Sequence, residues 1–304
     1  MQAVTVNNLT KIYGKEKFVA VKGISFTVEK GEIFGLIGPD GAGKTSIFRM
    51  LTTLLLPDGG SATVDGFDIV KDYKKIRNNV GYMPGKFSLY SDLTVEENLN
   101  FCAAIFNTTV TENYHLIKDI YVQIEKFKTR RAGKLSGGMK QKLALCCALV
   151  HKPTVLFLDE PTTGVDPVSR KEFWEMLKRL KDQGITIIVS TPYMDEANLC
   201  DRIALIQQGE TLSIDTPENI TQSYPDDLFA IKSDNMSSLL KAIYSFDKKT
   251  SGYAFGEYAH ISFKKNTMSE NEIKDHFSKQ GLSVTGVQKI QATIEDCFIK
   301  FLQN

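Results

Sequence analysis

Residues 38–45, Gly-Pro-Asp-Gly-Ala-Gly-Lys-Thr, are the part of the chain whose residue types and spacing most clearly predict chemistry. Glycines allow successive backbone N–H groups to turn inward around phosphate oxygens, and a following helix adds the partial positive charge of its N-terminus. Lys44 would bring a full positive charge to the β- and γ-phosphates of a nucleotide, and the Thr45 hydroxyl is placed to ligate Mg²⁺. The predicted nucleotide-binding residues of this phosphate loop are Gly38, Pro39, Asp40, Gly41, Ala42, Gly43, Lys44, Thr45 and Ser46.

The segments on either side of the phosphate loop are predicted to be a strand and a helix. Residues 32–37 form an apolar run that is too short for a helix. Residues 46–55 repeat apolar side chains at helical spacing and place Leu51 and Leu54 on one face. Strand, glycine loop and helix is the order that a phosphate loop requires, which argues against a chance glycine-rich turn.

An acidic pair, Asp159 and Glu160, follows the apolar run at residues 154–158. An aspartate at the end of a buried strand can hold Mg²⁺ directly or through water, and the adjacent glutamate can orient or deprotonate an attacking water. Such a pair is a weak signal by itself, because acidic strand ends are common. Together with the phosphate loop it predicts a Mg²⁺–ATP site, with Thr45 and Asp159 as metal ligands and Glu160 as the catalytic residue.

A second potential anion site lies at residues 135–139, Leu-Ser-Gly-Gly-Met, which we call the serine-glycine segment. The hydroxyl of Ser136 and the amides of Gly137 and Gly138 stand at the start of a predicted helix that runs to Val150. Helix capping is the structural alternative, and the serine is expected to serve that purpose too. One polypeptide rarely needs two unrelated phosphate-binding helix starts unless two chains share each nucleotide.

The phosphate loop, the serine-glycine segment, Asp159-Glu160-Pro161 and residues 164–167 (Gly-Val-Asp-Pro) occur in that order. In that order they resemble the ABC transporter ATPases, and the resemblance covers roughly residues 4–216. The sequences of residues 81–84 and 89–99 resemble those of the daunorubicin-resistance and multidrug exporter branch of this family.

The resemblance implies that two such domains close head to tail on two ATP molecules, so that Ser136 and Gly138 face the nucleotide of the partner. It places Tyr13 where the family has an aromatic that stacks on adenine, although a surface or core tyrosine is a serious competitor. The implied cofactors are ATP and Mg²⁺. The implied partners are a second nucleotide-binding domain, expected to form a heterodimer, and integral membrane permease subunits. The expected location is peripheral, at the cytoplasmic face of the inner membrane.

Two positions depart from the family pattern. Gly85 stands where the family has a glutamine that helps to coordinate Mg²⁺, and Pro192 stands where it has a histidine that contacts the γ-phosphate. Glycine offers no side chain, and proline offers neither a polar side chain nor a backbone N–H. The site in this chain is therefore expected to bind ATP and to hydrolyse it slowly. Compensation by Lys86 or another neighbour is the alternative.

Composition sets limits on partners and redox state. The formal net charge of +1 and a charged fraction of 24% give no electrostatic case for nucleic acid or an anionic membrane as the main partner. The five cysteines are scattered without a CxxC pair, which favours reduced thiols over disulfides or zinc. No apolar run is long enough to span a bilayer, and the first residues are not those expected of a signal peptide.

The expected fold is an α/β P-loop NTPase core with a mixed, largely parallel sheet, an antiparallel β layer and a helical subdomain. The core is assigned to residues 1–216, with the helical subdomain at about 91–150. Residues 217–304 are expected to form a small α+β appendage. Its strands are expected at 228–232, 259–264 and 282–290, and its helices at 236–246, 268–280 and 293–302. The resemblance implies that such an appendage is regulatory or dimer-stabilising.

Three functions compete at this point. The chain is either an ATPase subunit of an exporter, an ATP-gated partner whose mate hydrolyses, or a soluble ABC protein that acts on DNA or ribosomes. The third is disfavoured because the sequence shows no long coiled-coil insertion, no zinc-type cysteine pairs, no second cassette and no basic face. The first two are combined in the expectation of a transporter subunit with a weak site of its own.

Overall fold

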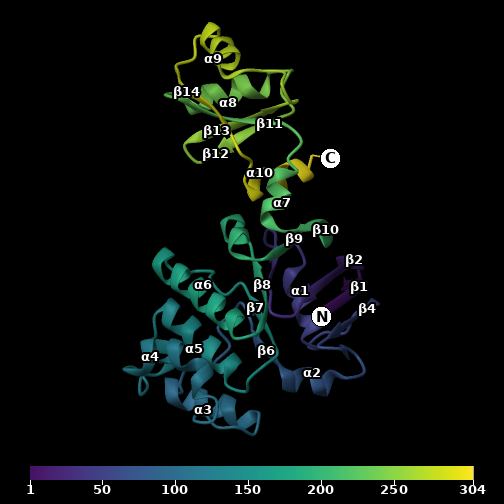
Figure 1. The fold of residues 1–304 in the computed structure, drawn as a ribbon, viewed down its shortest axis with the longest axis vertical. Helices are drawn as coiled ribbons and strands as arrows, with labels where there is room; N and C mark the ends of the chain where they lie inside the picture. The colour runs from purple at the N-terminus through teal and green to yellow at the C-terminus, as the bar shows by residue number, and fades with distance from the viewer. Residues whose placement is uncertain (304) are drawn as a thin grey trace. The chain divides into compact units, whose positions relative to one another are not determined.

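The computed structural model describes residues 1–303, which divide into two compact units (Figure 1). The first comprises residues 1–217 and the second begins at Glu218. Each unit has its own sheet or sheets and its own hydrophobic core.

A six-stranded sheet in the order β10-β9-β3-β8-β7-β6 is the centre of the first unit. All neighbours are parallel except the edge strand β10, which runs antiparallel to β9. Strands β3, β7 and β8 are buried along their whole length, which explains the apolar runs at residues 33–37, 155–158 and 187–189. The largely parallel sheet predicted from the sequence is confirmed. Its strands are β3 (Ile33–Ile37), β6 (Val80–Met83), β7 (Val155–Asp159), β8 (Thr186–Thr191), β9 (Arg202–Gln207) and β10 (Glu210–Asp215).

The predicted antiparallel layer is a second sheet of the first unit, in the order β2-β1-β4-β5. Its strands are β1 (Gln2–Tyr13), β2 (Phe18–Glu29), β4 (Gly59–Val64) and β5 (Phe67–Asp68). One hydrophobic core joins this layer, α1 (Lys44–Leu51) and the central sheet. Phe26 of the antiparallel layer stacks on Phe34 of β3, with ring centroids 5.3 Å apart. The core therefore fixes α1, and with it the phosphate loop, against the central sheet.

Figure 1 shows helices α3, α4, α5 and α6 together, on the side of the central sheet away from β1 and β2. Helix α5 packs against both α3 and α4. The three helices fall within the stretch predicted to be helical. The helices of this unit beyond α1 are α2 (Tyr73–Asn79), α3 (Val95–Ile105), α4 (Tyr114–Glu125), α5 (Gly137–Leu149) and α6 (Pro167–Asp182), with short 3₁₀ segments η1 (Ala132–Lys134) and η2 (Met194–Leu199).

Two helix boundaries differ from the sequence prediction. Helix α1 ends at Leu51 and not at Leu55, because Thr53 has a left-handed backbone with φ of +62°. Leu54 is consequently outside the helix and 56% exposed. The apolar spacing predicts a helix from about Ser169 to Gln183, but α6 begins at Pro167, two residues earlier. The side chain of Asp166 caps it by accepting a hydrogen bond from the Ser169 N–H at 3.0 Å.

The second unit has the β-α-β-β-α-β order of a ferredoxin-like fold. Its antiparallel sheet has the order β12-β13-β11-β14. The edge strand β12 is absent from the sequence prediction. The elements are β11 (Asp227–Ser233), α8 (Met236–Tyr244), β12 (Ser251–Phe255), β13 (Tyr258–Phe263), α9 (Glu270–Lys279), β14 (Val284–Ile290) and α10 (Ile294–Phe301), preceded by the short helix α7 (Pro217–Gln222) at the boundary between the units.

A buried polar cluster joins α10 to the sheet of the second unit. Asp296 of α10 is 0% exposed and lies 2.6 Å from Nδ1 of His260 on β13. The hydroxyls of Tyr253 and Thr293 also donate hydrogen bonds to the Asp296 carboxylate. Burial alone would raise the pKa of Asp296, but these hydrogen bonds outweigh it and lower the pKa below its ordinary value.

We expect Asp296→Asn to lower the free energy of unfolding by about 2 kcal/mol at pH 7, because buried donors lose a charged acceptor. Since the native pKa is lowered, this stabilisation is present above the ordinary aspartate pKa and is lost as pH falls through the native value. Scanning calorimetry from pH 7 down to pH 3, which is about one unit below the ordinary aspartate pKa, should show the difference in stability between the two proteins narrowing at the acid end. The exposed Asp275→Asn is the control. A difference that is constant across this range would contradict the assignment.

Candidate functional site

The phosphate loop connects β3 to α1, and Lys44 closes over it. The Lys44 side chain is 3% exposed, and its Nζ donates hydrogen bonds to the carbonyl oxygens of Gly38 and Pro39 at 2.8 and 2.9 Å. The same ammonium lies 3.4 Å from Oε1 of Glu160. A buried lysine whose nearest groups are backbone carbonyls and one carboxylate is a cation fixed at the loop.

Glycine is required at two positions of the loop for different reasons. A Cβ at Gly38 would lie 2.1 Å from the carbonyl oxygen of Ile206, which no side chain can accommodate. Gly43, the N-cap of α1, has φ of +104°, and a Cβ there would lie 2.5 Å from the carbonyl oxygen of Ala20. The spacing of the glycines therefore follows from how closely the loop approaches its neighbours.

Oxygen ligands suited to a divalent cation gather at the ends of β7 and β8. The hydroxyl of Thr45 donates to Oδ1 of Asp159 at 3.2 Å, and that of Ser190 donates to the same oxygen at 2.6 Å. Carboxylate and hydroxyl oxygens match the preference of Mg²⁺ for hard ligands, so these residues fit such an ion. Ser190 was not predicted as part of this group. In the sequence, Ser190 could have been noticed as a small polar residue that directly follows the apolar run at 187–189.

Glu160 has an unusual backbone that aims it at the phosphate loop. Its φ is +50°, in the left-handed region that non-glycine residues rarely adopt. The Glu160 N–H makes hydrogen bonds to the carbonyl oxygen of Ser190 at 3.0 Å and to its hydroxyl at 3.1 Å. These bonds hold the strained residue, and backbone strain of this kind is concentrated at functional sites.

Tyr13 and Ser46 lie at the mouth of the same site. The Tyr13 hydroxyl is 3.1 Å from Oγ of Ser46, and its side chain is 36% exposed, so it is not a core tyrosine. A cavity of about 230 Å³ is lined by Tyr13, Phe18, Ala20, residues 41–46 and Glu160. Phe18, which is 65% exposed, was not predicted. In the sequence, Phe18 could have been noticed as a second aromatic residue five positions after Tyr13, with which it pairs across the β1–β2 turn.

The serine-glycine segment lies elsewhere in the first unit. Ser136 caps α5, its hydroxyl accepting a hydrogen bond from the Met139 N–H at 3.4 Å, as predicted. A Cβ at Gly138 would lie 2.9 Å from Oγ of Ser169, and one at Gly137 would lie 3.4 Å from the carbonyl oxygen of Gly164. The segment is therefore packed against the start of α6. None of residues 136–138 lines the cavity at the phosphate loop within the described part of the chain.

The two departures from the family pattern follow β6 and β8, the strands on either side of β7, which ends at Asp159. A Cβ at Gly85 would lie 3.1 Å from the carbonyl oxygen of Asp159. Pro192 follows Thr191, the last residue of β8, and so comes two residues after Ser190. Lys86 is exposed and makes no ion pair with either acidic residue among residues 1–303. The described structure therefore shows no substitute charge from Lys86.

A mainly apolar groove of about 310 Å³ separates the central sheet from α3 and α5. Tyr90 and Phe101 stand nearby as an exposed edge-to-face pair, with ring centroids 4.9 Å apart. Residues that line the groove include Leu54, Tyr82, Met83, Pro84, Ser88, Leu89, Cys102, Phe106, Cys147 and His151. Burial, together with the nearby charge of Asp159, raises the pKa of Tyr82 to about 12.

Other predicted features can be read directly from residues 1–303. All five cysteines are free, and four of them are buried. No helix in this range is long and apolar enough to cross a membrane. No group of three or more His, Cys, Asp or Glu side chains within it could hold a metal ion.

Solved structures support the same fold. The structure of cbiO1 from Clostridium perfringens, part of the ABC transporter complex cbiONQ, matches 73% of this chain and 91% of its own, at 27% identity and a TM-score of 0.65. The ATP-binding cassette MJ0796, solved as a dimer bound to ADP and Pi, matches 70% of this chain and 98% of its own, at 26% identity and a TM-score of 0.64.

Sequence comparisons agree. The ABC transporter family model matches residues 21–163. The probable multidrug ABC transporter ATP-binding protein YbhF of Escherichia coli is 39% identical over 98% of this chain, which spans about half of that relative's length (52%). The linearmycin resistance ATP-binding protein LnrL of Bacillus subtilis is 40% identical over 70% of this chain and 69% of its own. The chain therefore belongs to the ABC transporter family of ATP-binding proteins, a family of ATPases coupled to transport.

Proposed function

We propose that this chain is the ATP-binding subunit of an exporter, which binds Mg²⁺–ATP and drives transport through separate membrane subunits. The observation that carries the proposal is the buried ammonium of Lys44, held in the phosphate loop and facing Glu160. The Thr45–Asp159–Ser190 oxygens supply the metal position. Names of relatives support export, since they include a doxorubicin resistance protein of Mycobacterium tuberculosis and a Nod factor export protein of Burkholderia lata.

The proposed roles at the phosphate loop follow from charge and geometry. The backbone N–H groups of residues 38–46 and the ammonium of Lys44 bind the phosphates, while Tyr13 stacks on the base. Mg²⁺, when bound, neutralises charge on the phosphate oxygens. Glu160 orients a water and accepts its proton as the water oxygen bonds to the γ-phosphorus and the bond to the β–γ bridging oxygen breaks. The products are ADP and inorganic phosphate.

A second cassette completes the proposed arrangement. Ser136, Gly137 and Gly138 start a helix yet do not line this chain's own cavity, so we assign them to the nucleotide of a partner cassette. We favour a different cassette as the partner, because Gly85 and Pro192 weaken this chain's own site. Each missing transition-state contact costs on the order of 10²–10³ in rate. An ATP-gated subunit that does not itself hydrolyse is the second candidate, supported by the same two positions.

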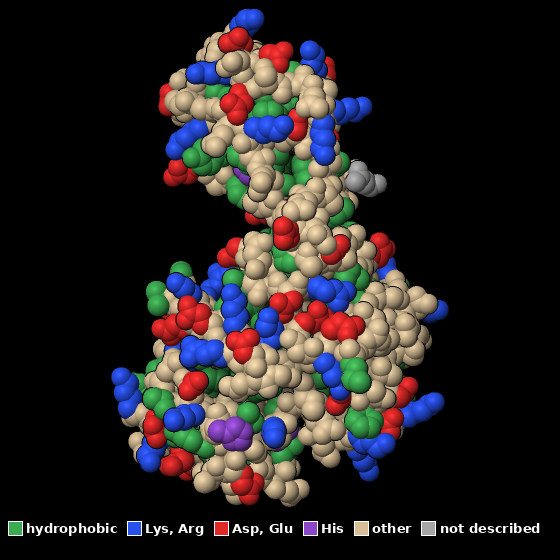
Figure 2. Space-filling view, in the orientation of Figure 1, with side chains coloured by type: hydrophobic (Ala, Val, Ile, Leu, Met, Phe, Trp, Pro, Cys, Tyr) green, Lys and Arg blue, Asp and Glu red, His purple; other side chains and the backbone are tan. Residues whose placement is uncertain are grey.

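The groove between the central sheet, α3 and α5 is proposed to receive a cytoplasmic segment of the membrane subunits. It is apolar and flanked by the exposed Tyr90–Phe101 pair, as expected of a protein-binding surface. The chain is therefore proposed to bind peripherally at the cytoplasmic face of the membrane. Nucleic acid is not a proposed partner: the net charge is +1, and acidic and basic side chains are interspersed on the face drawn in Figure 2.

Cross-linking tests the transporter assignment. A photoreactive group attached at Ser88→Cys, which lies exposed in the groove, should capture an integral membrane protein in native vesicles. The same group at Lys178→Cys, exposed on α6, should not. Mass spectrometry identifies the captured protein. Repeated failure at Ser88 with efficient labelling, or equal capture from both positions, would count against a membrane subunit in this groove.

The second unit is proposed to be regulatory or to stabilise the dimer. Its support is that it forms a separate compact body with its own core. A soluble ABC protein of another kind has no observation in its favour beyond the shared cassette fold.

A further inference from the structure

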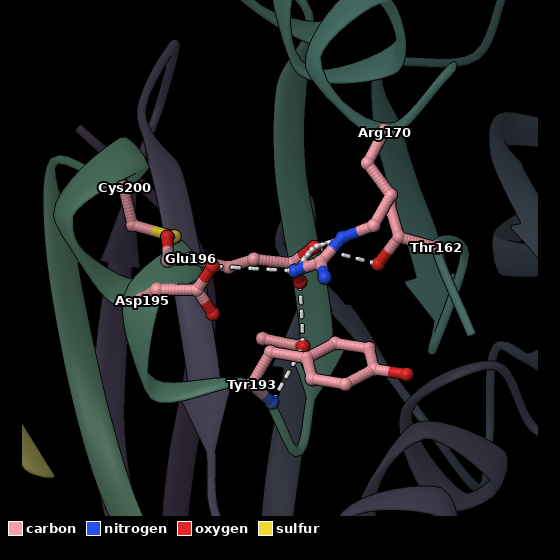
Figure 3. Close-up of polar contacts among 7 residues, drawn as sticks. Thr162, Arg170, Tyr193, Asp195, Glu196 and Cys200 are labelled. Atoms are coloured by element: carbon pink, nitrogen blue, oxygen red, sulfur yellow. Dashed lines mark hydrogen bonds and ion pairs between the residues drawn. The ribbon is translucent and has the colours of Figure 1, made fainter. Parts of the chain in front are cut away.

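A buried carboxylate outside the proposed nucleotide contacts connects two parts of the first unit. Glu196 lies in η2, just after β8, and is 2% exposed. A buried charge is costly unless it is paired and hydrogen-bonded, so the partners of Glu196 are held firmly in place. Figure 3 shows these partners converging on the Glu196 side chain.

Three segments meet at this carboxylate. Oε1 of Glu196 accepts hydrogen bonds from the Thr162 hydroxyl at 2.8 Å and from the Arg170 guanidinium at 2.9 Å. Oε2 accepts one from the Thr191 hydroxyl at 2.6 Å. The Thr191 hydroxyl accepts in turn from the N–H of Tyr193, whose ring lies under the Arg170 guanidinium at 4.2 Å. One side chain therefore ties the end of β8 to the loop after Glu160 and to α6.

On one side, the contact of Glu196 with Thr191 leads to the proposed metal site. Thr191 is bonded through the backbone to Ser190, which donates its hydroxyl hydrogen to Asp159. Asp159 also accepts from Thr45, the first hydroxyl of α1. A cation or phosphate that shifts Thr45 or Asp159 would therefore act on the segment that Glu196 holds.

On the other side, the contact of Glu196 with Arg170 leads to the serine-glycine segment. Arg170 follows Ser169 on α6, and Gly138 approaches Ser169 so closely that a Cβ there would lie 2.9 Å from its hydroxyl. Gly137 packs in the same way against the backbone of Gly164. A displacement of the start of α6 cannot be absorbed in so close a contact and must move the serine-glycine segment with it.

From these two connections we infer that Glu196 is a positioning residue that transmits occupancy of this chain's Mg²⁺–ATP site to its own serine-glycine segment. The inference rests on the proposed function. The segment would then be presented to the partner's nucleotide when this chain holds its own. Glu196 does not line the cavity at the phosphate loop and acts through Thr191, Thr162 and Arg170.

Hydrogen–deuterium exchange of the intact chain tests this transmission. Saturating Mg²⁺–ATP, verified by titration, should slow amide exchange of residues 136–140 by about 5-fold or more, the lower end of ordinary coupling between sites. Glu196→Gln should bind Mg²⁺–ATP with affinity within about 3-fold of the parent, because the loop contacts are untouched, yet lose this response. Asp195→Asn, the exposed neighbour that lies 3.4 Å from Arg170, is the matched control and should keep it.

The outcomes separate this inference from the proposed function. No binding of Mg²⁺–ATP by the parent chain would overturn the proposed function and the inference together. Binding without any change at residues 136–140, or the same change in Glu196→Gln, would overturn the inference alone.

A double variant distinguishes positioning from simple stabilisation. Glu196→Gln leaves Arg170 without its buried carboxylate, so the thermal midpoint should fall, and adding Arg170→Met should restore much of it. Turnover by a reconstituted pair of cassettes should fall about 10-fold or more in Glu196→Gln and should stay low in the double variant. Recovery of turnover together with the thermal midpoint would show a structural role only and would overturn the inference.

Discussion

Replacing Lys44 with alanine should weaken Mg²⁺–ATP binding by about 100-fold, because charge-assisted hydrogen bonds to two phosphates are worth roughly 3 kcal/mol. The structure supports a large effect, since the ammonium is buried and already oriented by the carbonyl oxygens of Gly38 and Pro39. Little rotational freedom would be lost when it exchanges these partners for phosphate oxygens. Isothermal titration calorimetry of the purified chain measures the effect directly.

Lys30→Ala is the control for this measurement. Lys30 forms an exposed ion pair with Asp65 at 2.7 Å and lies on a turn away from the loop. Its loss should leave nucleotide affinity within about 2-fold, since exposed ion pairs contribute little. Unchanged binding by Lys44→Ala, with the protein folded, would show that ATP binds elsewhere and would remove the main support for the proposed function.

Local motifs made the phosphate loop and the acidic pair predictable. Glycines 38 and 43 could be recognised by their spacing from Lys44 and Thr45, although the close approaches to Ile206 and Ala20 that require glycine there come from the fold. The buried strands were equally readable, because a strand covered on both faces needs an uninterrupted apolar run. These signals depend only on neighbours in the sequence.

Long-range contacts were not predictable in the same way. Ser190 reaches Asp159 only because β7 and β8 are parallel neighbours, and the sequence of neither strand specifies that pairing. Glu196 looks like any acidic residue of a polar segment until Thr162 and Arg170 are brought to it by the fold. Strand β12 was missed for a related reason. Its serine, glycine and alanine have weak strand preference, and pairing with β13 determines it.

A pair formed with a cassette that carries the usual glutamine and histidine should respond asymmetrically to two substitutions in this chain. Ser136→Arg should reduce turnover by about 100-fold or more, because it places a bulky side chain where the partner's γ-phosphate binds. Glu160→Gln should reduce turnover by no more than about 3-fold, because the site that contains Glu160 already lacks two transition-state groups of this size. Single-turnover and steady-state assays of phosphate release measure both.

This asymmetry follows from which parts of the chain are intact. The serine-glycine segment keeps its capped helix start and its packing against α6, so the surface offered to a partner is complete. The chain's own pocket keeps Lys44, Thr45 and Asp159 and should hold Mg²⁺–ATP in the closed dimer. Gly85 and Pro192 remove polar groups beside the acidic pair, and Lys86 forms no ion pair there among the described residues. Selection on a site used for binding alone would produce this pattern.

A substitution at the N-cap of another helix is the control for Ser136→Arg. Ser269→Arg removes the N-cap serine of α9 in the second unit, which accepts a hydrogen bond from the Glu272 N–H at 3.4 Å, and it should leave turnover within about 2-fold. A loss at Ser136 but not at Ser269 therefore reports the partner's nucleotide and not a frayed helix. If Glu160→Gln stops the pair as completely as Ser136→Arg, or if the lone chain hydrolyses ATP rapidly, the asymmetry is wrong. A neighbour within the pocket then replaces the missing groups, and both sites of the dimer hydrolyse ATP.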